Sequence, residues 1–148
     1  MRVALASDHA GFELKEKIAA YLEEAGFEIL DLGTNNEEPV DYPDFSRAIG
    51  NALQQQEADR GILICGSGVG ACVAANKMST IRAGLCHDTY SAHQGVEHDD
   101  INVLCLGARV IREELARELV SAFLAARFTG EERHRRRLDK IKAMEEEG

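Results

Sequence analysis

A cysteine directly before a glycine-rich turn is the part of the sequence best suited to chemistry. Cys65 precedes Gly66-Ser67-Gly68-Val69-Gly70. Glycines at alternate positions let main-chain N–H groups converge on a ligand, and such amides stabilise an oxyanion. A helix N-terminus after the turn would also favour the thiolate of Cys65. The pattern predicts a cysteine base or nucleophile beside an oxyanion site; the alternative is a turn that only reverses the chain.

The same turn also fits a nucleotide-binding pattern. The segment from Gly66 to Ala71 matches G-x-G-x-x-A, and Asp88 lies near the position of a ribose-binding acid. Against this, the turn follows the third predicted strand rather than the first, and 148 residues leave no room for a separate substrate domain. A P-loop is excluded because no Gly-Lys-Ser/Thr follows at the required spacing. A nucleotide-binding regulatory module stays as the alternative from another functional class.

A basic cluster lies near the C-terminus of an acidic chain. The formal net charge of −9 argues against a protein that tracks a nucleic-acid backbone, since that requires an excess of Lys and Arg. Arg133, His134 and the three arginines at 135–137 nevertheless lie together. Guanidinium groups gathered in this way suit a small anion such as phosphate. The alternative is a solvated helix face.

The other three cysteines give no sign of a metal site. Cys72, Cys86 and Cys105 form no C-x-x-C pair and no zinc-finger spacing, so we expect small buried hydrophobes in a reducing compartment. No apolar run approaches the roughly 20 residues that a membrane helix needs, and the N-terminus lacks a signal-peptide pattern. We expect a cytoplasmic protein without a metal, a cofactor, or a membrane or nucleic-acid partner.

Alternating strands and helices must position these residues. Apolar runs predict strands at 2–7, 27–32, 61–65, 82–86 and 101–106. Helical spacing of apolar residues predicts helices at 11–25, 44–56, from the glycine turn to about 78, at 113–127 and at 131–147. The stretch between the last two strands is expected to be helical or irregular. The strand at 61–65 is almost continuously apolar, as in a parallel sheet covered by helices. We expect one domain over residues 1–148, an α/β three-layer Rossmann-like fold with a parallel sheet of about five strands.

Several polar residues come directly after predicted strands. Ligands of open parallel sheets bind beyond the carboxyl ends of the strands. Asp8 and His9 follow the first strand, Cys65 ends the third, and Arg109 follows the fifth. His87 follows the fourth, but an isolated histidine after a strand is more often a structural hydrogen-bonding group than a catalyst. These residues are therefore expected to gather at one edge of the sheet.

Taken together and in order, these residues resemble those of type B ribose-5-phosphate isomerase. The shared motifs are Ser7-Asp8-His9-Ala10-Gly11, Asp41-Tyr42-Pro43, Cys65-Gly66-Ser67-Gly68-Val69-Gly70, Ala74-Ala75-Asn76-Lys77, His98 with Asn102, Gly107-Ala108-Arg109, and Arg133-His134 with Arg137. The match covers almost the whole chain. The wider family includes galactose-6-phosphate and allose-6-phosphate isomerases, so a hexose-6-phosphate isomerase of the same mechanism is the alternative.

The resemblance implies an enzyme of the pentose phosphate pathway that interconverts ribose 5-phosphate and ribulose 5-phosphate through a cis-enediolate, without metal or cofactor. Cys65 would move the proton between C2 and C1. Family members use either this cysteine or a glutamate after the last glycine, and that position here is Ala71. Ser67 would assist proton movement between the two oxygens, and His98 would open the furanose ring.

The resemblance also implies a set of substrate-binding residues. They are Asp8, His9, Tyr42, Gly66, Gly68, Val69, Gly70, Asp99, Arg109, Arg133 and Arg137. The phosphate is expected at His9 and the arginines, the enediolate oxygen at the turn amides, and sugar hydroxyls at Asp8. Asp99 departs from the family, which commonly has Asn there; a carboxylate only accepts hydrogen bonds, which changes the contacts offered to the sugar. A homodimer or tetramer with shared active sites is implied, with the helix at about 131–147 reaching the partner.

Overall fold

Five parallel strands form the sheet that organises the molecule. The structure is a computed structural model that describes residues 1–148. The strand order is β2-β1-β3-β5-β4, and every neighbouring pair is parallel. The strands are β1 (Arg2–Ser7), β2 (Glu28–Asp31), β3 (Arg60–Cys65), β4 (Ala83–Leu85) and β5 (Val103–Gly107). The predicted parallel sheet is confirmed, and its central strand carries Cys65 at the carboxyl end.

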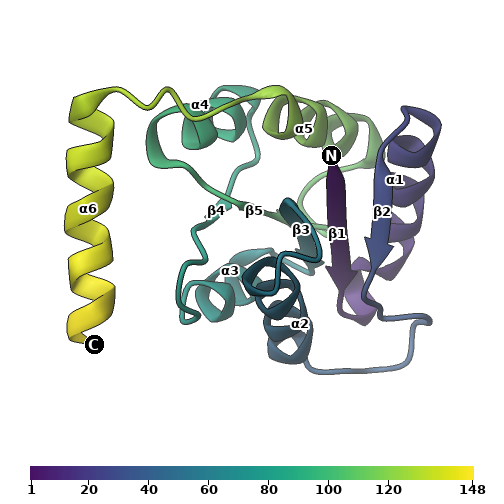
Figure 1. Cartoon of the computed structure of the whole chain (residues 1–148). Coiled ribbons are helices and arrows are strands. Elements are labelled where there is room, and N and C mark those ends of the chain that lie inside the picture. Colours follow the sequence, from purple (N-terminus) through teal and green to yellow (C-terminus); the bar gives the residue numbers. More distant parts are fainter.

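Helices cover both faces of the sheet (Figure 1). On one face pack α1 (Phe12–Glu24), α4 (Thr89–Asp99) and α5 (Glu113–Ala125), and on the other α2 (Tyr42–Gln54) and α3 (Val69–Ala75). A short 3-10 turn, η1 (His9–Gly11), leads into α1, and α6 (Glu132–Glu147) ends the chain. None of these helices combines the length and the apolar content needed to cross a membrane. The three layers confirm the predicted Rossmann-like α/β fold.

Side chains alternate between the two faces along the central strand. On β3, Ile62 and Ile64 belong to the apolar cluster that includes α1, α4 and α5. Leu63 and Cys65 belong to the cluster that includes α2 and α3. All four residues are buried. Because successive residues of a strand point to opposite faces, the register of β3 places the Cys65 thiol on the α2–α3 face.

Among the helix boundaries that differ from the sequence prediction, two have a clear local reason. α2 begins at Tyr42 rather than at residue 44, because Pro43 occupies the first turn, where its fixed φ suits a helix and its missing N–H leaves no bond unmade. α3 ends at Ala75 rather than near residue 78. The side-chain amide of Asn76 accepts from the N–H of Ala83 at 2.8 Å and donates to its carbonyl at 3.0 Å. These two bonds tie the end of α3 to β4.

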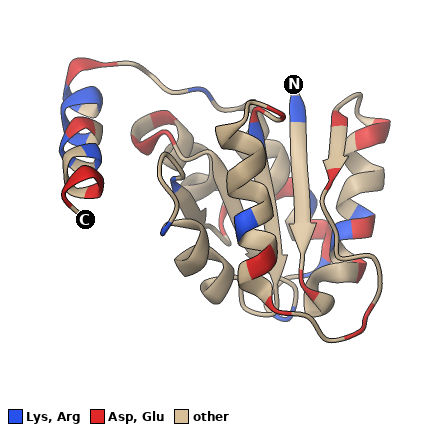
Figure 2. Cartoon of the chain, turned by 60° about the horizontal axis from the view of Figure 1, so that its bottom comes forward, with Lys and Arg blue, Asp and Glu red and all other residues tan.

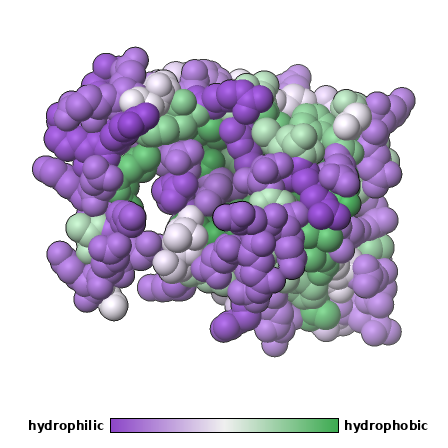
Figure 3. Space-filling model, viewed as in Figure 1, coloured by the Kyte–Doolittle hydropathy of each residue, from purple (hydrophilic) through white to green (hydrophobic).

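The C-terminal helix α6 stands apart from the other elements (Figure 1). It carries basic residues interspersed with acidic ones and ends in an acidic run (Figure 2). A hollow separates its middle from the body of the molecule (Figure 3). His134 is buried near the start of the helix, and Glu145 near its end accepts from the N–H of Thr80 at 3.0 Å. Ile141 and Met144 are exposed. The helix therefore buries little apolar surface against its own chain.

Gly11 lets η1 approach the end of β3. A methyl group built on Gly11 would lie 2.5 Å from the carbonyl oxygen of Ile64, the residue before Cys65. The N–H of Asp8 donates to the same carbonyl at 3.2 Å. The close contact of main chains holds the loop after β1 against the end of β3.

Replacing Gly11 with alanine is expected to lower the free energy of unfolding by about 1–3 kcal/mol, because the added methyl group meets main chain that cannot move without shifting β3. Gly66→Ala is the matched control: its methyl group would lie 3.1 Å from the movable guanidinium of Arg109, so the loss should be smaller. Equilibrium urea unfolding measures both variants. Equal losses would contradict this account of the contact.

Candidate active site

A cavity of about 380 Å³ opens at the carboxyl edge of the sheet. Its lining residues are Asp8, Tyr42, Cys65, Gly66, Ser67, Gly70, Arg109 and Val110. They come from the loops after β1, β3 and β5 and from the start of α2. The structure thus brings together seven residues of the predicted site. Val110 is the additional member, and no sequence signal marked it, since an apolar residue shortly after a strand is typical of ordinary packing.

The Cys65 thiol receives a hydrogen bond from the glycine turn. The N–H of Gly68 donates to Cys65 Sγ at 3.2 Å, and Cys65 is only 4% exposed. Gly68 has φ +82°, and a methyl group there would lie 2.5 Å from Leu85 Cδ1 and 2.9 Å from the main chain of Leu106. Only glycine therefore fits at this point of the turn. The sulfur is therefore held directly beside the main-chain N–H groups of the turn.

The rest of the turn forms one wall of the cavity. The N–H of Val69 donates to Ser67 Oγ at 3.2 Å, which holds the serine hydroxyl at the start of α3. Val69 itself is exposed. The ring of Tyr42 lies against Gly70, where a methyl group would come within 2.6 Å of Tyr42 Cζ. Absence of a side chain at Gly70 is what allows the tyrosine ring to close this side.

Asp8 and His9 fix the loop after β1 with their side chains. Asp8 is buried, and its Oδ1 accepts from the N–H of Gly11 at 3.1 Å. His9 Nδ1 accepts from the N–H of Val40 at 3.1 Å. A neutral imidazole that accepts at Nδ1 carries its proton on Nε2, so His9 keeps one donor for a ligand.

Arg109 is the cation of the cavity. Its guanidinium lies over Gly66, with Nη1 3.1 Å from the position of a methyl group built there. No carboxylate lies within ion-pair distance of Arg109. Its main-chain N–H donates to Gly66 O at 2.9 Å, which fixes the loop after β5 to the glycine turn. A guanidinium without an acidic partner at the edge of a cavity is suited to bind an anion.

Four predicted site residues lie elsewhere in the chain. His98 and Asp99 are at the end of α4, and Arg133 and Arg137 are on α6. α4 packs on the face of the sheet opposite to Cys65 and leads back to the start of β5, whereas Cys65 is level with the end of β5. Within one chain these four residues do not share the cavity with Cys65, and their roles stay predictions.

His87 has the structural role that the sequence favoured. Its Nε2 accepts from the N–H of Gly107 at 3.0 Å, so the ring ties the loop after β4 to the end of β5. Burial lowers the pKa of His87. A lowered pKa suits this bond, because the accepting nitrogen must stay unprotonated.

The remaining cysteines occupy different environments. Cys86 and Cys105 are buried, as predicted, and burial raises the pKa of Cys86 to about 11. Cys72 is only half-buried, contrary to prediction, because it lies on α3 beside the edge strand β4, where its Sγ donates to Ala83 O at 3.6 Å. A hydrogen bond with Cys105 lowers the pKa of Cys72 to about 7, against the opposing effect of burial.

Outside the cavity, the chain offers few other groups of side chains suited to catalysis or metal binding. No three His, Cys, Asp or Glu side chains converge in a group that could hold a metal ion. A second cavity of about 340 Å³ lies beside α1 and contains none of the predicted site residues. Its charged side chains include Lys17 and Glu113, which pair with each other at 3.7 Å. The expected cytoplasmic location and the expected lack of a nucleic-acid partner stay predictions.

Comparison with known proteins assigns this geometry to a family. The family model for ribose/galactose isomerases matches residues 3–141. The chain belongs to this family. Among ribose/galactose isomerases, ribose-5-phosphate isomerase B of Escherichia coli is 45% identical over 145 residues, which are 98% of this chain and 97% of the relative. The predicted resemblance is confirmed, and the chain is an aldose–ketose sugar phosphate isomerase by family.

Further members of the ribose/galactose isomerase family support the fold and show a range of sugars. Ribose-5-phosphate isomerase B of Clostridium thermocellum has a solved structure with a TM-score of 0.97 and 44% identity, covering 99% of both chains. D-erythrulose-4-phosphate isomerase of Pectobacterium atrosepticum is 41% identical over 132 residues, 88% of this chain and 86% of the relative. Family membership favours an isomerase over the nucleotide-binding alternative.

The His87 bond should make stability depend on pH. The folded-state pKa of His87 lies below its unfolded value, so the unfolded chain binds the proton more readily and acid favours unfolding. The contribution of His87 is present above the ordinary histidine pKa and is lost as the pH falls below about 6.5.

We expect the Tm of His87→Gln to fall less steeply than that of the wild type between about pH 7.5 and about pH 5.5, because a glutamine oxygen can accept from Gly107 without titrating in this range. Thermal unfolding followed by circular dichroism measures the two slopes. Equal slopes of Tm against pH in the two proteins would show that His87 does not cause the pH dependence of stability.

Proposed function

We propose that this chain interconverts ribose 5-phosphate and ribulose 5-phosphate through a cis-enediolate, with Cys65 as the base. The observation that carries the proposal is the hydrogen bond from Gly68 N–H to Cys65 Sγ inside a cavity that also holds Asp8 and an unpaired arginine. Two relatives at 45% and 44% identity are ribose-5-phosphate isomerases B, which supports the five-carbon substrate.

The cavity supplies what proton transfer between two neighbouring carbons needs. Cys65 takes the proton from C2 of the aldose and returns it to C1, and the electron pair passes through the enediolate. The turn amides stabilise the negative charge on the enediolate oxygens, a contribution that typically amounts to about 10²–10³ in rate. Ser67 assists the movement of the remaining proton from O2 to O1, and Asp8 binds sugar hydroxyls.

The phosphate is anchored away from the reacting carbons. Arg109 offers an unpaired guanidinium at the cavity, and His9, next to Asp8 in the chain, offers a donor through Nε2. Arg133 and Arg137 on α6 complete the anion site in our proposal. Binding energy from a group that does not react orients C1 and C2 against the base.

The placement of His98 supports an active site shared between two copies of the chain. His98 lies on α4, on the face of the sheet opposite to Cys65 and near the start of β5. The 5 residues of β5 separate its start from the level of Cys65 by roughly 13 Å, which is beyond the reach of a side chain. A His98 that opens the ring of a sugar held at Cys65 therefore belongs to a second copy, and we infer a homodimer.

An apolar surface on neighbouring elements supports the same assembly. Val69 and Val73 on α3 are 51% and 58% exposed, Leu85 on the edge strand β4 is 37% exposed, and Tyr90 on α4 is 65% exposed. Single chains rarely leave an extended apolar surface uncovered. We propose that a second copy covers it and that α6 of each copy reaches the cavity of the other.

Cys65→Ala should lower kcat for ribulose 5-phosphate formation by about 10²–10⁴ with little change in KM, because it removes the base and leaves the anion site intact. A coupled assay for ribulose 5-phosphate measures the loss. The control is Cys86→Ala, which removes a buried thiol on the opposite face of the sheet. Near-normal kcat in Cys65→Ala would show that the base is wrong, and a higher kcat/KM for allose 6-phosphate would favour the hexose alternative.

Mixing two inactive variants tests the shared site. Cys65→Ala and His98→Asn are each expected to be inactive, but a mixed dimer holds one site with both groups intact. Refolding the two together should restore up to about a quarter of wild-type activity, since about half of randomly paired dimers are mixed and each has one complete site. Continued inactivity of verified mixed dimers would place both residues in the site of one chain.

A further inference from the structure

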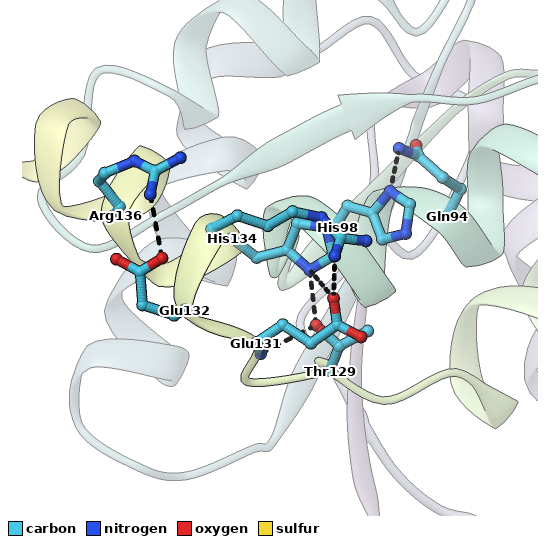
Figure 4. A network of polar contacts seen from close by, with 8 residues as sticks. Gln94, His98, Thr129, Glu131, Glu132, His134 and Arg136 are labelled. Atoms are coloured by element: carbon cyan, nitrogen blue, oxygen red, sulfur yellow. Dashed lines mark hydrogen bonds and ion pairs between the residues drawn. The ribbon is translucent and has the colours of Figure 1, made fainter.

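Two histidine rings stack where α6 meets α4. The rings of His98 and His134 have centroids 4.2 Å apart and an interplanar angle of 25°. His134 is only 2% exposed, although it lies on a helix whose other residues are mostly exposed. Figure 4 shows the two rings face to face, one from each helix. This stack is the principal buried contact that α6 makes with the body of the molecule.

Each ring is also held at Nδ1. Gln94 Nε2 lies 2.8 Å from His98 Nδ1, one helical turn earlier on α4. Thr129 Oγ1 lies 2.6 Å from His134 Nδ1, and the same oxygen accepts from the N–H of Glu131 at 3.2 Å. An amide can donate or accept, so Gln94 bonds to His98 Nδ1 in either protonation state of the ring. Nε2 is then the nitrogen of His98 that can exchange a proton with a ligand.

Burial and most of the neighbouring charges disfavour the protonated form of His134. Burial lowers its pKa, and the neighbouring His98, Arg133 and Arg137 lower it further. Glu131, whose carboxylate lies 4.0 Å from Nδ1, acts in the opposite direction. A neutral flat ring supports His98 without repelling it when His98 gains a proton.

We propose that His134 is a positioning residue for ring opening: its ring holds His98 with Nε2 toward the sugar. The proposal rests on the ring-opening role given to His98 above. In that step the C1–O4 bond of the furanose breaks, O4 takes a proton from His98 Nε2, O1 loses its proton to water, and His98 regains a proton from solvent. Arg133 and Arg137 flank His134 on α6. The same helix therefore carries the arginines proposed to bind the phosphate and the residue that positions His98.

Ring opening can be measured apart from isomerisation. In Cys65→Ala the enediolate step is blocked, but opening and reclosure of ribose 5-phosphate still exchange its two anomers. NMR saturation transfer at saturating sugar follows this exchange, and calorimetry gives the Kd of the sugar. Adding His134→Ala should slow the enzyme-dependent exchange about 10- to 100-fold, because the imidazole of His98 is no longer held in its reactive position. Adding His134→Phe, which keeps a flat ring on His98, should restore most of it.

The matched control is His93→Ala, which removes a partly exposed histidine of α4 that pairs with Glu97 and should leave the exchange unchanged. If His134→Ala does not fold, Gln94→Ala, which frees His98 Nδ1, must slow the exchange instead. The proposal is overturned if the folded variant, His134→Ala or Gln94→Ala, exchanges the anomers as fast as Cys65→Ala alone. It is also overturned if His134→Phe slows the exchange as much as His134→Ala, or if Cys65→Ala itself does not accelerate the exchange. A wild type without isomerase activity would instead refute the proposed function.

Discussion

The fit of the glycine turn into the end of the sheet is the constraint on which the proposed chemistry depends. Gly68 takes a left-handed conformation between Leu85 and the main chain of Leu106, where no side chain fits. In that position its N–H points at the Cys65 sulfur from 3.2 Å. Leu106 is there because β5 is the neighbour of β3 in the sheet. The direction of the donor thus follows from the strand order and does not depend on a mobile side chain.

The topology also explains why one copy of the chain holds only part of the proposed machinery. Loops that follow strands meet at the carboxyl edge, which brings Asp8, Cys65 and Arg109 together. The end of a crossover helix must return to the opposite edge, and His98 is at such an end. α6 stands apart from the sheet, and none of its arginines lines the cavity of its own chain. Residues of the second group can act on the same sugar only when another copy supplies them.

Local patterns made the fold and half of the site predictable. The continuous apolar run of β3, the alternating glycines and the polar residues after strands depend on neighbours in the sequence, so the sheet and the surroundings of Cys65 could be inferred. Contacts between distant segments could not. The stack of His98 on His134 depends on how α6 docks, Val110 carries no chemical signature, and the exposure of Cys72 depends on β4 being an edge strand.

The state of Cys72 affects how thiol chemistry on this protein is interpreted. The hydrogen bond with Cys105 lowers the pKa of Cys72, so this thiol ionises more readily than an ordinary one, and the residue is half-buried where Cys65 is almost fully covered. Alkylating reagents such as iodoacetamide react with accessible thiolates. We expect them to modify Cys72 before Cys65, which places the adduct between α3 and β4, next to the glycine turn. Loss of activity after such treatment would then result from distortion of α3 and would not show that Cys65 had reacted. Labelling experiments that aim to identify the base therefore need a variant in which Cys72 has been replaced.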